Sequence, residues 1–382
     1  MVRFFSSLLA LLITSTAFAA TPHYVITNDD NGGPNTVSLY TVTGSASSPR
    51  VTLKKTLSTG GMAIGGGYFA GTDIILVRDG QDDCAFVANG GTSDITGIKL
   101  STQQVTGNFK GSRNDNGGFN GVTLTTNGSY VYASFTGTFT IASLQIIPGC
   151  ALQFVKDISA VGKDLGMAGP IAAKGNILIV SYGDGSIESF DISNGYAKPN
   201  NDEQFASGVN LGDKPSGIDI TQDGHYAIFG DIAGGTTVEV SDISGGKLTP
   251  TLVYNLGSAI DSNNVRLSPD ESLLYISNNM QGTVTAAFFD KTTGAATPGC
   301  TSNVLKGYPL KWFYDAGLGT ALATGTGGLI YVAEDGPSSG IGLLNITVNG
   351  STCTLTELPS SPVADPNSPD LRSFQAYPNR PF

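Results

Sequence analysis

Residues 274–279 read Leu-Tyr-Ile-Ser-Asn-Asn, and close variants of this phrase occur six more times along the chain. Each variant has three apolar or aromatic residues, then a small residue, then Asn, Asp, Gly or a similar turn former. The seven copies begin at Tyr24, Ala85, Tyr130, Leu178, Tyr226, Leu274 and Ile330. From Tyr130 to Leu274 the copies follow one another at intervals of 48 residues. A fixed period of this size is typical of a repeat architecture.

Each copy of the phrase is flanked by further short strands and tight turns. Residues 217–225 (Gly-Ile-Asp-Ile-Thr-Gln-Asp-Gly-His) and 265–272 (Val-Arg-Leu-Ser-Pro-Asp-Glu-Ser) read as a strand followed by a turn. A third strand follows the phrase, as at 283–289, and a Gly-rich turn leads to a fourth, as at 246–254. Four strands in about 48–52 residues match one blade of a β-propeller. We therefore expect an all-β, seven-bladed β-propeller with four antiparallel strands per blade.

The two ends of the repeat array predict how the ring closes. The first copy starts at Tyr24 with no strand before it, while residues 371–377 read as a strand without a blade of its own. A loop-like stretch, 360–369, precedes this last strand. An open row of blades leaves its two end faces in water, whereas a ring covers both. We expect the C-terminal strand to become the innermost strand of the first blade, and residues 20–382 to form a single domain.

The first 20 residues predict secretion. Arg3 supplies a positive charge, residues 8–13 are apolar, and Ala17-Phe18-Ala19 fits the small-x-small rule for signal-peptide cleavage. We expect residues 1–19 to be a signal peptide and the mature protein to be extracellular, or periplasmic in a bacterium. No later stretch is long and apolar enough to predict a membrane span. In a eukaryote the sequons at Asn127, Asn345 and Asn349 would accept glycans, whereas in a bacterium they are Asn-rich turns.

Composition excludes several classes of protein. The 382 residues include 51 Gly, 20 basic and 31 acidic side chains, for a net charge of −11, so no basic face for nucleic acid is expected. Hydrophobic residues make up 40%, which is ample for a core, and we expect a monomer. The four cysteines, Cys84, Cys150, Cys300 and Cys353, allow three disulfide pairings, and the sequence does not choose among them. Their spacing excludes a zinc site.

Residues 267–279 and 220–226 resemble the YVTN-type repeat and the lactonase-like seven-bladed propeller family, which includes 6-phosphogluconolactonases and carboxymuconate-cyclising enzymes. The resemblance spans the mature chain, but its motif describes a fold that many proteins without this activity share. It implies a site with His, Arg and Glu at the channel mouth. This chain has only His23, before the second strand of the first blade, and His225, after the Asp223-Gly224 turn at the opposite end from the mouth. The catalytic residues are therefore left unassigned.

Scarce cations and one tryptophan suggest where a ligand binds. Arg266 and Arg372 fall on inner strands, and Lys311 and Trp312 fall in a connection between blades. Converging cations suit an organic carboxylate or phosphate, and the indole suits a sugar ring or an aromatic acid. Polar side chains of the inter-blade segments complete the candidate ligand set, namely Asn120, Ser216 and Asn264. The alternative is structural: Arg266 pairs with a neighbouring Asp, and Trp312 packs between blades.

Acidic residues recur in the loops between the second and third strands. They are Asp29, Asp30, Asp184, Asp231 and Asp335. Because these loops fall at the same place in every blade, their oxygens would ring one face and suit Ca²⁺. Tight turns require the same residue types, and no Asp-x-Asp-x-Asp-Gly loop is present. We favour the turn interpretation and expect no cofactor.

Two functions compete. The first is a secreted binding module that takes a small anion, a carbohydrate or an extracellular protein at its channel or loop face. The alternative is a lactonase or lactonising enzyme with its site at the mouth of the central channel. The shortage of histidine favours binding, because nothing in the sequence supplies the family's catalytic His.

Overall fold

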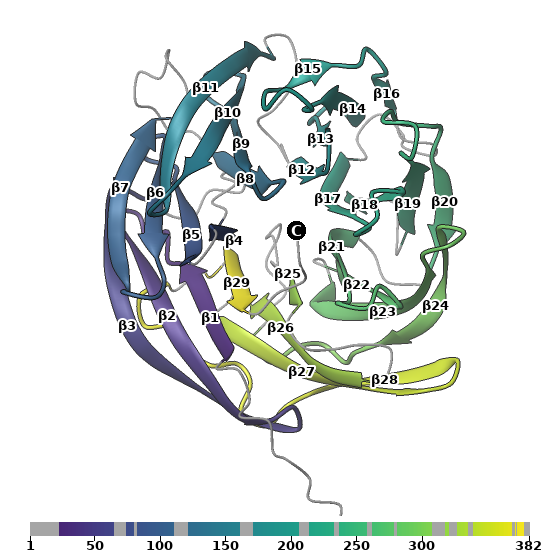
Figure 1. Cartoon of the computed structure of the whole chain (residues 1–382). Helices are drawn as coiled ribbons and strands as arrows, with labels where there is room; N and C mark the ends of the chain where they lie inside the picture. The colour runs from purple at the N-terminus through teal and green to yellow at the C-terminus, as the bar shows by residue number, and fades with distance from the viewer. Residues whose placement is uncertain are drawn as a thin grey trace, which may run out of the picture.

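The computed structural model describes residues 23–64, 74–79, 82–110, 121–160, 171–205, 214–232, 237–257, 262–278, 281–307, 318–320, 327–334, 339–368, 371 and 373–377. These residues form seven antiparallel sheets set around a common centre, one sheet per blade (Figure 1). No α-helix occurs in these ranges. The expected seven-bladed β-propeller is confirmed.

The repeated phrase forms the second strand of every blade. In blades 1 to 7 these strands are β1 (His23–Asn28), β5 (Asp82–Asn89), β9 (Tyr130–Phe135), β13 (Ile177–Ser181), β18 (Tyr226–Ile232), β22 (Leu273–Asn278) and β26 (Gly327–Glu334). Apolar residues follow one another without alternation here because both faces of each strand pack against a neighbouring blade.

The other strands complete each sheet from the axis outward. The innermost strands of blades 1 to 7 are β29 (Ser373–Tyr377), β4 (Ile74–Asp79), β8 (Val122–Thr126), β12 (Ile171–Lys174), β17 (Lys214–Ile220), β21 (Ser262–Leu267) and β25 (Leu318–Thr320). The third strands are β2 (Pro34–Ser45), β6 (Asp94–Lys99), β10 (Thr140–Ile147), β14 (Ser186–Asp191), β19 (Thr237–Asp242), β23 (Thr283–Asp290) and β27 (Gly340–Asn349). The outer strands are β3 (Ser48–Met62), β7 (Gln104–Lys110), β11 (Ala151–Ser159), β15 (Lys198–Pro199) with β16 (Gln204–Phe205), β20 (Leu252–Asn255), β24 (Ala295–Thr301) and β28 (Thr352–Glu357).

The ring closes as the sequence predicts. The C-terminal strand β29 pairs antiparallel with β1, from Tyr24 opposite Tyr377 to Asn28 opposite Ser373 (Figure 1). Blade 1 therefore has the strand order β29-β1-β2-β3, which joins the two ends of the chain in one sheet. Phe374 of β29 is buried in the core between blades 7 and 1.

Blade 4 departs from the regular pattern at its outer edge. Two short strands, β15 and β16, both pair with β14 instead of one continuous outer strand. Between them Asn201 has a positive φ of 55°, and Asp202 accepts hydrogen bonds from the backbone nitrogen and the hydroxyl of Ser189 in β14. A carboxylate thus replaces backbone partners where the chain turns aside.

The hydrophobic core is divided into seven clusters, one at each interface between neighbouring blades. Between blades 1 and 2, for example, Ile26 and Val37 meet Ile74 and Val87. Full burial of one such aliphatic side chain stabilises the fold by about 1.5–3 kcal/mol. Because each blade contributes to two interfaces, the ring has no free apolar end face.

Both disulfides join adjacent blades, which selects one of the three pairings left open by the sequence. Cys84 in β5 is bonded to Cys150 in the turn after β10, linking blades 2 and 3. Cys300 in β24 is bonded to Cys353 in β28, linking blades 6 and 7.

Candidate functional site

The second strands end at one face of the ring, which we call the loop face, and this end holds buried polar side chains. Six equivalent positions carry a polar residue whose exposure is at most 1%: Asn28, Asn89, Ser134, Tyr182, Asn278 and Glu334. Tyr182 donates to Glu188 at 2.9 Å, and Asn278 donates to the hydroxyls of Thr283 and Thr285. Tyr182 and Asn278 thus hold the end of the second strand to the third strand of the same blade, whereas Asn28 donates to the carbonyl of Ala88 in the next blade.

Asn89 is the centre of the network between blades 1 and 2. Its Nδ2 donates to Asp94 at 2.6 Å and to Thr96 at 2.7 Å. Its Oδ1 accepts from Asn35 and from Thr59, both at 2.8 Å. All four hydrogen-bonding positions of the amide are therefore used inside the protein.

Asp29, one of the residues considered for calcium, is buried in a cluster of hydroxyl groups. Its Oδ1 accepts from Thr27 at 2.6 Å, and its Oδ2 accepts from Thr36 at 2.6 Å and Ser38 at 2.9 Å. Burial raises the pKa of Asp29 to about 6, and the charge of Asp365 adds to the effect, while the three hydroxyl bonds oppose it. Asp365 itself was not foreseen, because it lies 338 residues from Thr27, its hydrogen-bond partner.

The remaining aspartates of the calcium hypothesis are separate turn residues where the structure describes them. Asp30 accepts from the backbone nitrogen of Ile64, and Asp184 is exposed and accepts from Ser186 of its own turn. Asp231 lies within β18, with its side chain outside the described part, and Asp335 lies outside it altogether. No group of three His, Cys, Asp or Glu placed to hold a metal occurs among the residues described.

Glu334 marks the loop-face end of blade 7, in the same predicted loop as the calcium candidate Asp335, but it was not among the site residues predicted from the sequence. It accepts from the backbone nitrogen of Gly307 at 2.6 Å and from the hydroxyl of Ser361 at 3.2 Å. Burial raises its pKa to about 7, helped by the charge of Glu357 and opposed by Lys306. Its position at the end of a repeated phrase was the available signal.

Polar side chains of the inner strands reach across to the next blade. Thr125 in β8 accepts from the backbone nitrogen of Ala173 in β12 at 3.0 Å. Asp219 in β17 accepts from the backbone nitrogen of Leu267 in β21 at 2.8 Å. An inner strand has no further strand on its axis side, so its edge N–H groups need such acceptors.

Arg266 in β21 reaches in the opposite direction. It pairs with Tyr275 of β22, which packs in the cluster between blades 6 and 7, so the arginine starts on the blade 7 side of its strand. Its Nη1 nevertheless donates to the carbonyl of Ile218 in blade 5, at 3.3 Å. Because β22 occupies the outer edge of β21, the side chain crosses the inner edge, and the guanidinium lies on the axis side of the ring.

From the sequence, Arg266 either binds an anionic ligand or pairs with a neighbouring Asp, and its surroundings bear on this choice. Among the described residues no carboxylate forms an ion pair with it. Asp261, one of the acidic residues near it in sequence, lies outside the described part. Arg266 is followed at once by the turn 268–272, so it lies nearer the face opposite the loop face. Asn264 is closer to the loop face, where its backbone nitrogen donates to Ser277.

The other candidate ligand residues fall where the structure does not describe a side chain. Asn120, Lys311, Trp312 and Arg372 lie outside the described residues. Ser216 lies in β17, and its side chain is likewise not described. Their role therefore stays a prediction.

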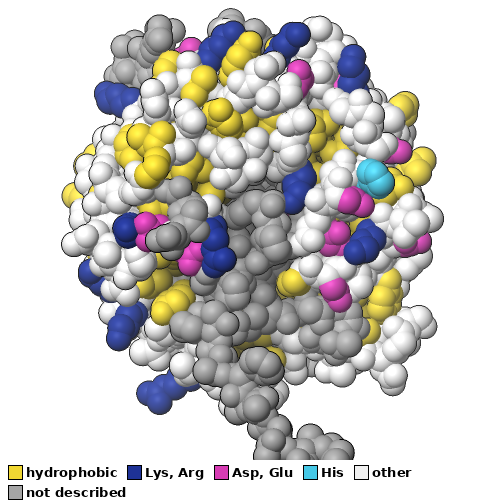
Figure 2. Space-filling model, viewed as in Figure 1, with side chains coloured by type: hydrophobic (Ala, Val, Ile, Leu, Met, Phe, Trp, Pro, Cys, Tyr) yellow, Lys and Arg dark blue, Asp and Glu magenta, His cyan; other side chains and the backbone are white. Residues whose placement is uncertain are grey.

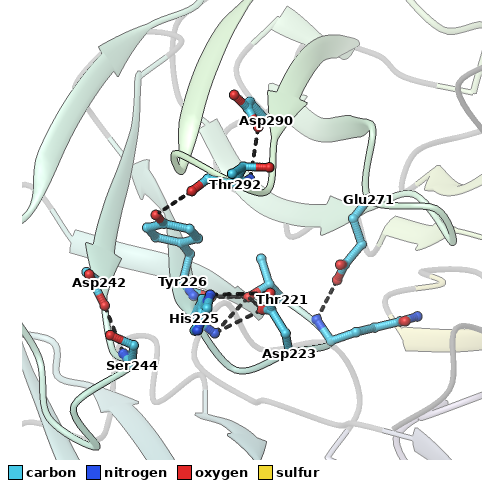
Figure 3. A network of polar contacts seen from close by, with 10 residues as sticks. Thr221, Asp223, His225, Tyr226, Asp242, Ser244, Glu271, Asp290 and Thr292 are labelled. Carbon is cyan, nitrogen blue, oxygen red and sulfur yellow. Dashed lines mark hydrogen bonds and ion pairs between the residues drawn. The ribbon is translucent and has the colours of Figure 1, made fainter.

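The face opposite the loop face, which we call the turn face, carries His225. Its Nδ1 lies 3.4 Å from Asp223 in an exposed turn, and the neighbouring Tyr226 donates to the carbonyl of Thr292 in the next blade (Figure 3). Hydrogen bonds from Ser244 hold the pKa of Asp242 below its usual range. Figure 2 shows basic side chains scattered over the face in view rather than gathered in one patch, in keeping with the net charge of −11.

The three sequons differ in accessibility. Asn349 is exposed at the end of β27, whereas Asn345 is paired on both sides within that strand. Asn127 uses its side chain in the turn before β9, where Oδ1 accepts from the backbone nitrogens of Ser129 and Tyr130. Of the three, Asn349 is the position most open to a modifying enzyme.

Comparisons with known proteins give likeness in structure alone. No protein-family model and no curated protein matches the chain. The periplasmic gluconolactonase PpgL of Pseudomonas aeruginosa is 13% identical with a TM-score of 0.53, over 72% of this chain and 80% of that one. A candidate 6-phosphogluconolactonase of Bacteroides fragilis is 17% identical with a TM-score of 0.53, over 72% and 79%. A protein of unknown function from Desulfotomaculum acetoxidans is 14% identical with a TM-score of 0.62, over 88% and 100%.

At these sequence identities, the likeness shows a shared fold and does not show a shared activity. A helix able to cross a membrane is absent from the described residues. The blade count, the strand order and the structural neighbours agree, and the chain has the lactonase-like seven-bladed propeller fold.

Proposed function

We propose that this protein is a secreted binding module that holds a small organic anion against Arg266, on the axis side of its inner strands. The observation that carries the proposal is the path of that side chain. It leaves β21 toward blade 7 and ends at the carbonyl of Ile218 in blade 5, so its guanidinium faces the axis.

The chemistry of the guanidinium supports an anion as the ligand. It has five N–H donors in a planar fork that matches a carboxylate or phosphate, and the bond to Ile218 uses Nη1. A partly buried guanidinium that has no carboxylate partner among the described residues favours water or an anion beside it. In a chain of net charge −11, such a positive group is scarce.

A carbohydrate or an extracellular protein bound at the loop face is the wider form of this hypothesis. At that face the described amides and carboxylates of Asn28, Asn89, Asp29 and Glu334 are buried and engaged in hydrogen bonds. They are therefore poor contacts for a partner. This favours the inner strands over the loop face.

The test is isothermal titration of the mature protein with D-gluconate and 6-phosphogluconate, with D-glucose as the uncharged probe. We expect the acids to bind and Arg266→Ala to weaken binding by about 1.5–3 kcal/mol, roughly 10- to 100-fold. Arg266→Lys should keep part of the affinity because it keeps the charge. The matched control is Arg78→Ala, on inner strand β4, whose arginine is 70% exposed and paired with Asp83. Equal binding by wild type and Arg266→Ala would refute the proposal.

Lactone hydrolysis or formation is the second candidate, and two gluconolactonase-type neighbours favour it. In that case Arg266 would orient the acid group of the product. Incubation of the purified protein with glucono-1,5-lactone separates the two functions, since a binding module leaves the spontaneous rate unchanged. Turnover that disappears in Arg266→Ala would establish the enzyme instead.

Secretion is part of the proposal and rests on residues 1–19, which precede the described part of the chain. Their composition supports a cleaved signal peptide. N-terminal sequencing of the exported protein should begin at residue 20 or 21. Export with Met1 retained would contradict this part of the proposal.

A further inference from the structure

Residues 358–368, which we call the closing strap, connect the last blade to the C-terminal strand. On blade 7 the backbone of Val363 exchanges two hydrogen bonds with Ile341 of β27. Nearby, the hydroxyl of Ser361 accepts from the backbone nitrogen of Leu343, and Lys306 donates to the carbonyl of Leu358. One side of the strap is therefore held by blade 7.

The other side of the strap is held by blade 1. Asn367 donates to Ser38 of β2 at 2.9 Å and to Thr56 of β3 at 3.0 Å. Thr27 of β1 lies 3.0 Å from Asp365. Since β29 begins five residues after Ser368, these contacts position the strand that closes the ring.

The proton count at this junction does not balance if both carboxyl groups are ionised. The hydroxyl oxygen of Thr27 lies 2.6 Å from Oδ1 of Asp29 and 3.0 Å from Oδ2 of Asp365, but a hydroxyl has one proton to donate. The two aspartates are 1% and 6% exposed, and neither is in an ion pair with a basic side chain of the described residues. Two buried carboxylates at such distances repel unless one holds a proton.

We propose that Asp29 and Asp365 share a proton through Thr27 in the folded protein, and that this proton fastens the closing strap, so that ring closure weakens as pH rises. The proton that the two carboxyl groups share comes from the solvent. The device is independent of Arg266 and of the anion proposed above.

The groups that face the pair agree with this assignment. Burial and the charge of Asp365 place the pKa of Asp29 near 6. Tyr40 of β2 is buried beside the pair, and burial followed by the charge of Asp365 raises its pKa far above its usual value, so it remains a neutral phenol. Apart from Asp365 and Tyr40, no titratable group of the described residues acts on Asp29.

A second buried acid acts on the same strap. Glu334 accepts from Ser361, and its pKa is raised to about 7 by burial and by Glu357, with Lys306 opposing. Both acids thus have folded-state pKa values above their ordinary ones. Such groups bind protons more tightly in the folded state, so their contribution to stability is greatest at low pH. For Asp29 it is lost as pH rises from about 4 to 6, and for Glu334 from about 4.5 to 7.

The test compares wild type with Asp29→Asn and Asp365→Asn, by urea unfolding at pH 5 and pH 7.5 in EDTA. Either amide can donate from its nitrogen to Thr27 while its oxygen keeps the other hydrogen bonds, so each variant mimics the protonated pair. The folding equilibrium constant of wild type should be lower at pH 7.5 than at pH 5. In Asp29→Asn this decrease should be about tenfold smaller than in wild type. Asp290→Asn is the control, because hydrogen bonds from Thr292 and Thr293 keep the pKa of that exposed carboxyl low. Amide hydrogen exchange, corrected for the intrinsic exchange rate at each pH, should show lower protection of residues 373–377 at pH 7.5 than at pH 5 in wild type and not in Asp29→Asn.

Three results would overturn the proposal. The first is an unchanged pH dependence in both amide variants. The second is a rise in wild-type stability from pH 5 to pH 7.5. The third is stabilisation by added Ca²⁺ at pH 7.5 that Asp29→Asn abolishes, which would show that the pair takes a cation rather than a proton. If one amide variant does not fold, the other and the exchange of residues 373–377 in wild type still decide.

Discussion

Asn89 uses both its amide hydrogens and both acceptor positions of its oxygen between blades 1 and 2. In this fold single polar side chains supply hydrogen bonds at the edges of the blades, where a helix or a wider sheet would use backbone groups. The same is true of Asp219, which accepts a backbone N–H from the neighbouring inner strand. Arg266 differs from both, because it is a donor with a long stem and a charge.

Asn89→Asp is a near-isosteric change that tests this network. A second carboxylate would then lie 2.6 Å from Asp94, in place of the amide nitrogen. We expect a loss of about 2–4 kcal/mol in the free energy of unfolding at pH 7, because two donors vanish and like charges meet. Urea unfolding at pH 7 and pH 4.5 measures it, and the loss should shrink at the lower pH. An equal loss at both values would contradict the charge argument.

At this scale the sequence predicts residue types better than roles. The Asn and Asp residues that end the repeated phrase were correctly placed near turns, but their burial depends on the next blade and cannot be read locally. The contact of Thr27 with both Asp29 and Asp365 was not predicted, because Asp365 is far from the other two residues in sequence and reaches them only when the ring closes.

The strands are the elements that the sequence predicts best. Seven copies of one phrase became seven second strands, because a run of β-branched and aromatic residues buried on both faces suits no other element here. The outer edge was harder to predict. In blade 4 a carboxylate hydrogen bond replaces part of the outer strand, and nothing in the apolar pattern signals this. The disulfide pairing was also beyond the sequence, since it depends on which blades are neighbours.

Each disulfide covalently links two blades that already share an apolar interface. Replacing Cys84 and Cys150 by Ala should lower the free energy of unfolding by about 2–5 kcal/mol, because the loop they close spans 66 residues. Replacing Cys300 and Cys353, which are 53 residues apart, should cost a similar amount. Urea unfolding of the two double variants measures both. Midpoints equal to that of wild type would show that the interfaces alone set the stability.

For the whole molecule, closure decides whether seven blades behave as one unit. The sequence predicted the C-terminal clasp because one strand was left over and one blade was short, and β29 fills that place. The clasp joins segments from the two ends of the chain, so every blade then has two neighbours.

A chain that ends at residue 370 should lose its single cooperative unfolding transition. Blade 1 would lack β29, which would expose the inner edge of β1 and remove Phe374 from the core between blades 7 and 1. The matched control ends at Tyr377 and keeps the strand. Differential scanning calorimetry distinguishes the two, and a chain ending at residue 370 that melts like the control would refute the clasp.

A crystal structure of the mature protein grown with D-gluconate would test whether Arg266 holds an organic anion on the axis side of the ring. We predict the gluconate carboxylate about 2.7–2.9 Å from the guanidinium nitrogens of Arg266, between the inner strands of blades 5 and 6. Gluconate bound elsewhere, or an Arg266 that binds only the carbonyl of Ile218 at saturating gluconate, would contradict the claim.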